Sequence, residues 1–139
     1  MRKIYLRVAV GVLGALMALA AMLSSGSLGQ DNVPLIWDGH LMLRIRVAAG
    51  GLTPEQRAAE IQMRLEDLMA DQFAHEREDI VGRITVRKLR REAVIEGPSG
   101  LLLTVTQADA RANEATVPWL AKYWRARIEA AMIVATRTG

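Results

Sequence analysis

The stretch DGHLMLRIRVAAGGLTPEQRAAEIQMRLEDLM, residues 38–69, predicts a β-strand, a glycine turn and a capped α-helix. Residues 41–47 alternate with one apolar face, a pattern that predicts a half-buried strand. The expected inward residues are Leu41, Leu43, Ile45 and Val47, and the expected outward residues are Met42, Arg44 and Arg46. Gly50 and Gly51 then provide the positive φ angles that a sharp reversal needs.

The helix that follows is expected over residues 54–73. Thr53 and Gln56 have the spacing of a capping box, and Pro54 falls at the first helical position, where its missing N–H costs nothing. Apolar residues at helical spacing form the expected buried stripe. They are Ala58, Ile61, Leu65, Leu68, Met69 and Phe73. The charged residues Arg57, Glu60, Arg64 and Asp67 are expected to face solvent, with Glu60 and Arg64 paired.

Residues 1–29 differ in composition from the rest of the chain. Arg2, Lys3 and Arg7 precede an uncharged apolar run at 8–23, and residues 24–29 are small and polar. This order is typical of an export signal. A 16-residue helix is about 24 Å long, which is short for about 30 Å of hydrocarbon. Two alternatives follow: a cleaved signal peptide, or a retained anchor that attaches the domain to the membrane through residues 8–23.

Residues 30–139 are expected to form one domain with no net charge. The whole chain has 18 basic and 15 acidic residues, and the surplus of three is Arg2, Lys3 and Arg7. A nucleic-acid-binding domain would need a basic surplus of its own, so this class of partner is excluded. The signal predicts an exported protein, in the periplasm or on the extracytoplasmic face of the inner membrane.

The rest of the chain predicts three short strands and a second helix. The strands are expected at 83–88, 92–96 and 101–106, with a turn near Arg90 and Arg91 and another at 97–100. The inward residues should be Ile84, Val86, Ala93, Ile95, Leu101, Leu103 and Val105. The second helix should begin near Thr116, with Pro118 in its first turn and Trp124 in its buried stripe. No internal repeat is evident.

The order β-α-β-β-β-α predicts a small α+β domain after the N-terminal hydrophobic signal or anchor helix. Its sheet should be mainly antiparallel, with both helices on one face. The opposite face should be solvated, or else it is an interaction surface. Its residues would be Arg44, Arg46, Thr85, Arg87, Glu92, Glu96, Thr104 and Thr106.

No motif predicts catalysis, and neither a cofactor nor a metal site is expected. His40 and His75 lack a second ligand at metal spacing, and Gly97–Gly100 lacks the Lys-Ser/Thr of a phosphate loop. Trp119 and Tyr123 lie one helical turn apart and are expected to cover the edge of Trp124. The candidate interaction residues are Arg44, Arg46, Arg87, Trp119 and Tyr123.

Three blocks of the chain resemble an exported domain that precedes the membrane helices in some relatives of the small-conductance mechanosensitive channel. They are LIWDGHLMLRIRVAAGGLTPEQRAAEIQMRLEDL, IEGPSGLLLTVTQADA and LAKYWRARIEAAM. The matching residues are Asp38, Gly39, Leu41, Arg46, Thr53, Pro54, Glu55, Arg57, 102–106, Ala108, Asp109, Ala110, Leu120, Ala121, Trp124 and Ile128. Gln107 departs from the pattern, which has aspartate there.

The resemblance covers residues 35–135 and implies the accessory domain of such channels, without the pore helices. Two functions are expected from it. One is a non-catalytic exported interaction or regulatory domain that binds a protein partner or itself. The other is a membrane-anchored accessory subunit of a channel or of another envelope complex.

Overall fold

The computed structural model describes residues 32–74 and 83–138. The expected signal or anchor at 1–29, the expected loop at 75–79 and the side chain of Phe73 lie outside the described part. Five strands and three helices occur in the described residues. They are β1 (Val33–Trp37), β2 (His40–Ile45), α1 (Pro54–Ala74), β3 (Thr85–Lys88), β4 (Ala93–Gly97), β5 (Gly100–Val105), α2 (Gln107–Ala112) and α3 (Val117–Thr138). The predicted α+β class is confirmed.

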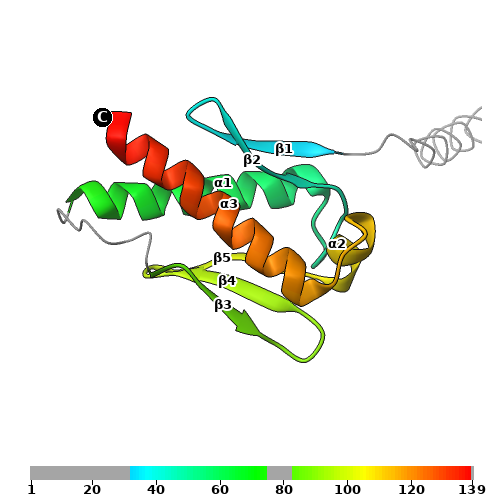
Figure 1. The fold of residues 1–139 in the computed structure, drawn as a ribbon. Helices are drawn as coiled ribbons and strands as arrows, with labels where there is room; N and C mark the ends of the chain where they lie inside the picture. The colour runs from blue at the N-terminus through cyan, green and yellow to red at the C-terminus, as the bar shows by residue number, and fades with distance from the viewer. Residues whose placement is uncertain (1–31, 75–82, 139) are drawn as a thin grey trace, which may run out of the picture. The chain divides into compact units, whose positions relative to one another are not determined.

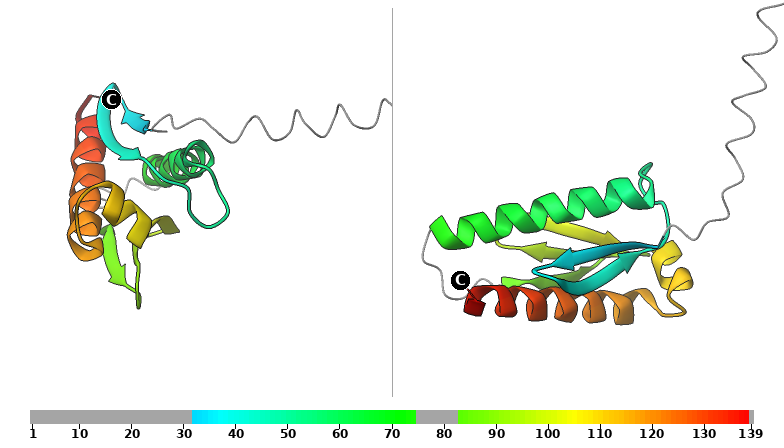
Figure 2. Two further views of the ribbon diagram at one scale, coloured as in Figure 1. Left: turned by 90° about the vertical axis from the view of Figure 1, so that its right-hand side faces the viewer. Right: turned by 90° about the horizontal axis from the view of Figure 1, so that it is seen from above.

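The strands form two antiparallel sheets, and the prediction of one sheet is wrong. One sheet is the hairpin β1–β2, and the other has the order β3–β4–β5. The two long helices do not share one face: α1 and α3 run in the same direction on opposite sides of the core, and the two sheets close the remaining sides (Figure 1, Figure 2). α3 packs against β2 of the hairpin and also against β3 and β4 of the other sheet.

Local signals in the sequence account for the ends of these elements. The backbone N–H of Gln56 donates to Thr53 Oγ1 (3.3 Å), and that of Thr53 donates to Gln56 Oε1 (2.9 Å), so the predicted capping box is confirmed. Asp38 and Gly39 both have positive φ, as a two-residue hairpin turn requires. The predicted turn at 97–100 is also confirmed, since Gly97 pairs with Gly100 across it.

Two β-bulges overturn the predicted alternation of buried residues. In β1–β2, Leu35 pairs with Leu43 and Ile36 with Leu41, so Met42 is the extra residue. A bulge shifts the side-chain alternation by one. Met42 is therefore buried and Leu41 exposed, the reverse of the prediction.

The same displacement occurs in β4–β5. Ile95 pairs with Leu103 and Glu96 with Leu101, which leaves Leu102 as the extra residue. Leu102 is buried and Leu101 is exposed, where the sequence predicted Leu101 inside. The buried positions of Ala93, Ile95, Leu103 and Val105 are confirmed.

The second hairpin repeats the first, 60 residues further along the chain. Each strand pairing of β1–β2, from Val33↔Ile45 to Trp37↔His40, recurs in β4–β5, from Ala93↔Val105 to Gly97↔Gly100. The bulge falls at the same place in both hairpins. The sequence showed no repeat, and the strand pairing reveals one.

The helices repeat as well, 63 residues apart. Thr116 Oγ1 accepts from the N–H of Trp119 as Thr53 Oγ1 accepts from that of Gln56. Beyond the first turn, the described buried residues of the two helices correspond one to one. In α1 they are Arg57, Ala58, Ile61, Leu65, Leu68 and Met69, and in α3 they are Leu120, Ala121, Trp124, Ile128, Ala131 and Met132. The domain is therefore two ββα units, to which β3 and α2 are added.

An arginine of each unit donates hydrogen bonds to backbone carbonyls of the other unit. Arg64 and Arg127 are each the eleventh residue of their helix. Arg127 of the second unit donates to the Leu41 and Met42 carbonyls in the first bulge, with a 3.1 Å bond from Nε to Met42 O. Arg64 of the first unit donates to Leu102 O in the second bulge (3.3 Å). This reciprocal contact indicates an approximate two-fold axis between the units.

Candidate functional site

The described residues bury two charged side chains, and they form a pair. Arg57 and Asp109 are 7% and 1% exposed. Nη1 and Nη2 of Arg57 donate to Oδ1 and Oδ2 of Asp109, each at 2.9 Å. A two-pronged guanidinium–carboxylate contact of this kind has strong directional specificity. The prediction that Arg57 faces solvent is wrong.

The same guanidinium joins α1 to two further segments. Nη1 donates to the Val47 carbonyl at 2.6 Å, in the connection between β2 and α1. Nη2 donates to the Thr104 carbonyl of β5 at 3.2 Å. Arg57 thus satisfies backbone acceptors from both ββα units, which a nonpolar residue at this place could not do.

Asp109 is held by the start of α2, a helix that the sequence analysis missed. The N–H and the hydroxyl of Thr106 donate to Asp109 Oδ2 at 2.9 and 2.8 Å, and the N–H of Asp109 donates to Thr106 Oγ1 at 3.2 Å. This is a capping box. The Thr-x-x-Asp spacing was the available signal, together with an arginine next to the apolar stripe of the preceding helix.

The carboxylate of Asp109 therefore accepts four hydrogen bonds, two from Arg57 and two from Thr106. Both oxygens are engaged by the protein itself, and both partners are fixed by secondary structure. This arrangement supports a structural role, in which the pair connects α1, β5 and α2, rather than proton transfer.

A groove of about 280 Å³ runs beside this pair, between α1 and β5. Arg57, Glu60 and Arg64 are among its lining residues, with Ile61, Leu101 and Leu103. Two of these charges are paired with each other, because Arg64 Nη2 donates to Glu60 Oε2 at 2.9 Å, as predicted. Glu92 also lines the groove. Across the described ranges, no group of three or more His, Cys, Asp or Glu side chains could hold a metal ion.

The predicted interaction residues do not form one sheet face. Arg44 and Arg46 belong to β2 and its end, and Arg46 Nη1 donates to the carbonyl of Ala112 in α2 (3.4 Å). Arg87 lies on β3 in the other sheet. Its Nη2 and Nε donate to the Glu96 carboxylate at 2.6 and 3.1 Å. Hydrogen bonds from Arg87 lower the pKa of Glu96 below its ordinary value.

Trp119 and Tyr123 are brought together on the outer side of α3. Their ring centroids are 5.2 Å apart and the ring planes differ by 9°, so the rings are stacked. Trp119 is 58% exposed and Tyr123 is 47% exposed. The sequence correctly paired them, but a side chain that covers the core edge would be more deeply buried. Large exposed aromatic surface is uncommon without a binding role.

The internal repeat tests whether the fold requires this stack. The α1 positions equivalent to Trp119 and Tyr123 are Gln56 and Glu60, both polar, while the buried residues of the two helices correspond beyond the first turn. The α1 helix therefore packs into the domain with polar side chains at both positions.

Residues 34–135 match a protein family described as a domain of unknown function (DUF8459). The chain belongs to this family. The match begins in β1 and ends in α3, so the family domain includes both ββα units, the Arg57–Asp109 pair and the aromatic stack. No curated protein and no solved structure gives a significant match to the chain. In the part of the chain that the structure describes, no helix is both long and apolar enough to cross a membrane.

Proposed function

We propose that this DUF8459 domain is exported and acts by contact, without catalysis, through a surface centred on Trp119 and Tyr123. The observation that carries the proposal is the exposed stack, because the equivalent positions of α1 show that the fold does not need it. The buried acid offers no competing site, since Asp109 is fully hydrogen-bonded within the protein.

The proposed location outside the cytoplasm rests on residues 1–29, whose basic, apolar and small polar parts follow the order of an export signal. The resemblance to the extracytoplasmic domain of small-conductance-type mechanosensitive channels supports an accessory role beside a membrane protein. A retained segment 8–23 would make the protein an anchored subunit of such an assembly.

Site-specific photocrosslinking in cells tests the contact surface. A benzophenone amino acid at Trp119 should give defined covalent adducts, whereas the same group at Met63 should give far fewer. Met63 is a matched control because it lies on α1 and is 56% exposed, close to the 58% of Trp119. Equal adducts from both positions would reject the aromatic surface as the contact site.

Export is tested separately by fusing alkaline phosphatase after Gly139, since this enzyme needs disulfides that form outside the cytoplasm. An active fusion is expected, and charged replacements at 15–18 should abolish the activity by interrupting the apolar run. An inactive fusion from an intact, well-expressed protein would reject the proposed location.

A further inference from the structure

We propose that the partner of this surface is the headgroup region of an anionic phospholipid membrane. The inference rests on the proposed contact role of Trp119 and Tyr123 and names what they contact. Stacked tryptophan and tyrosine rings suit this region, because each ring has an apolar body and a polar edge.

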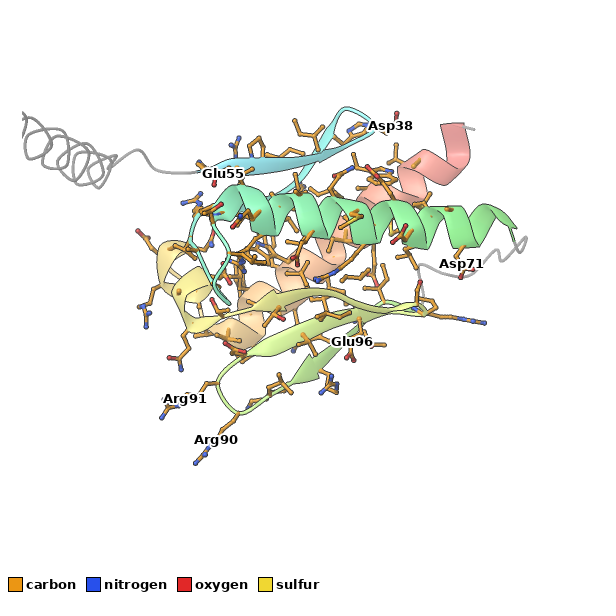
Figure 3. The ribbon with its side chains drawn as sticks, turned by 180° about the vertical axis from the view of Figure 1, so that it is seen from behind. Asp38, Glu55, Asp71, Arg90, Arg91 and Glu96 are labelled. Carbon is orange, nitrogen blue, oxygen red and sulfur yellow. The ribbon has the colours of Figure 1, made fainter. Side chains whose placement is uncertain are left out.

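Exposed basic side chains occur at the same end of the domain as the aromatic pair (Figure 1). Lys122 comes between Trp119 and Tyr123 in the sequence of α3 and is exposed. The turn between β3 and β4 adds Lys88, Arg90 and Arg91, all exposed, and α3 packs against β3. Figure 3 shows Arg90 and Arg91 pointing away from the body of the domain. The turn and the start of α3 lie at the same end of the domain in Figures 1 and 2.

The charge balance at this corner favours a negatively charged partner. Residues 88–92 and 114–123 contain four basic residues against two acidic ones, Glu92 and Glu114. Leu89, at the start of the turn, is 37% exposed and adds an apolar side chain among the basic ones. A surface that combines aromatic rings, an exposed leucine and several lysines and arginines has the composition of a membrane-interface site.

β1 begins at the end of the domain where α2, the start of α3 and the β3–β4 turn lie (Figure 1, Figure 2).

The aromatic and basic residues of this corner are not repeated at the equivalent positions of the first unit. Where α3 has Trp119, Lys122 and Tyr123, α1 has Gln56, Ala59 and Glu60. The two units thus differ at these positions: only the second unit has aromatic and positively charged side chains there.

Fluorescence quenching by brominated lipids tests the proposal on the full chain reconstituted into vesicles. Tryptophan emission should be quenched more in the native protein than in a Trp119→Gln variant when the vesicles contain brominated phosphatidylglycerol. In vesicles of brominated phosphatidylcholine alone, the difference should nearly vanish. Trp119→Gln installs the residue that α1 carries at this position, so folding should be retained, which thermal melting checks.

A charge variant separates lipid attraction from the effect of tethering. Arg90→Glu with Arg91→Glu keeps both rings but reverses two charges at the corner. If each basic side chain near an anionic surface contributes about fivefold to binding, this variant should lose the extra quenching in phosphatidylglycerol vesicles. Met63→Gln, on α1, should leave the quenching as it is in the native protein.

Quenching that is equal in the native and Trp119→Gln proteins would overturn the lipid proposal. So would quenching that depends on Trp119 but not on headgroup charge, as burial of the rings against a second copy of the chain would give. In either case, photocrosslinking from residue 119 to a protein would leave the proposed contact surface standing. If both the quenching and the photocrosslinking experiments failed, the proposal that Trp119 and Tyr123 form a contact surface would be rejected.

Discussion

Arg57 and Leu120 occupy equivalent positions in the two ββα units, but Arg57 is paired with the buried Asp109 whereas Leu120 packs into the apolar core. The same position of the repeat thus holds a charged residue in the first unit and a nonpolar residue in the second. The charged residue lies on α1 of the first unit, and its acidic partner comes from α2, which is inserted between β5 and α3 of the second unit. The insertion and the arginine depend on each other.

Arg57→Leu should lower the free energy of unfolding by about 3–5 kcal/mol, the usual cost of leaving a buried charge without its partner. The double variant Arg57→Leu with Asp109→Asn should recover part of this loss. Asparagine keeps an oxygen that can accept from Thr106 while removing the charge. Urea unfolding of the two single variants and the double variant measures the coupling. Strictly additive losses would contradict a direct pair.

Arg127, which bridges the units, can be compared with Arg125, whose ion pair lies within α3. Arg127→Met should cost about 1–2 kcal/mol, because it removes two charged donors from the carbonyls of the first bulge. Arg125→Met should cost less than about 0.5 kcal/mol, since Arg125 forms a surface pair with Glu129 in the same helix. Thermal or urea unfolding under identical conditions distinguishes them. Equal effects would show that the bulge carbonyls are satisfied by water.

Two tryptophans of α3 should differ sharply in their contribution to stability. Trp124 is 2% exposed and lies in the core, whereas Trp119 is 58% exposed. Trp124→Ala should cost about 3–5 kcal/mol, as emptying a large aromatic site does. Trp119→Ala should stay within about 0.5 kcal/mol of the native protein. A large loss in Trp119→Ala would mean that the stack supports the fold after all.

The cross-strand pair Arg87–Glu96 predicts a specific pH response. The pKa of Glu96 is lowered in the folded state by hydrogen bonds from Arg87. The carboxylate form is therefore favoured by folding, and its contribution is present above the unfolded pKa and lost as the pH falls through the lowered folded value. A carbon-detected NMR titration should place the native pKa below that in Arg87→Gln. Identical pKa values in the two proteins would rule out the pair in solution.

Short-range patterns in the sequence predicted the two long helices, the capping box at Thr53 and the turns, but not α2. The capping box at Thr53 and Gln56 needs four neighbouring residues, and the turn at 97–100 needs one dipeptide signal. The buried face of α1 followed from helical spacing, with Arg57 as the exception. These features are local, so the sequence contains all the information that they require.

The misplaced residues lie where the local pattern is ambiguous. Residues 41–43 and 101–103 are LML and LLL, and an unbroken apolar run is compatible with either alternation. The bulge that selects Met42 and Leu102 is set by pairing with another strand. The repeat was hidden because equivalent positions hold dissimilar residues, such as Ile61 and Trp124. The exposed stack could be named from helical spacing, but its exposure depends on packing.

The contact between Arg127 and the first bulge can form only late in translation, because its two partners are far apart in the sequence. The carbonyls of Leu41 and Met42 lie 86 and 85 residues before the arginine that covers them. While the chain is still being made, the first hairpin has an open bulge and an uncovered β2 edge, which is a site for unwanted strand pairing. Long separations between contacting residues also slow folding. A nascent chain in which α3 has not yet been made therefore exposes this edge, and α3 conceals it once it folds against β2.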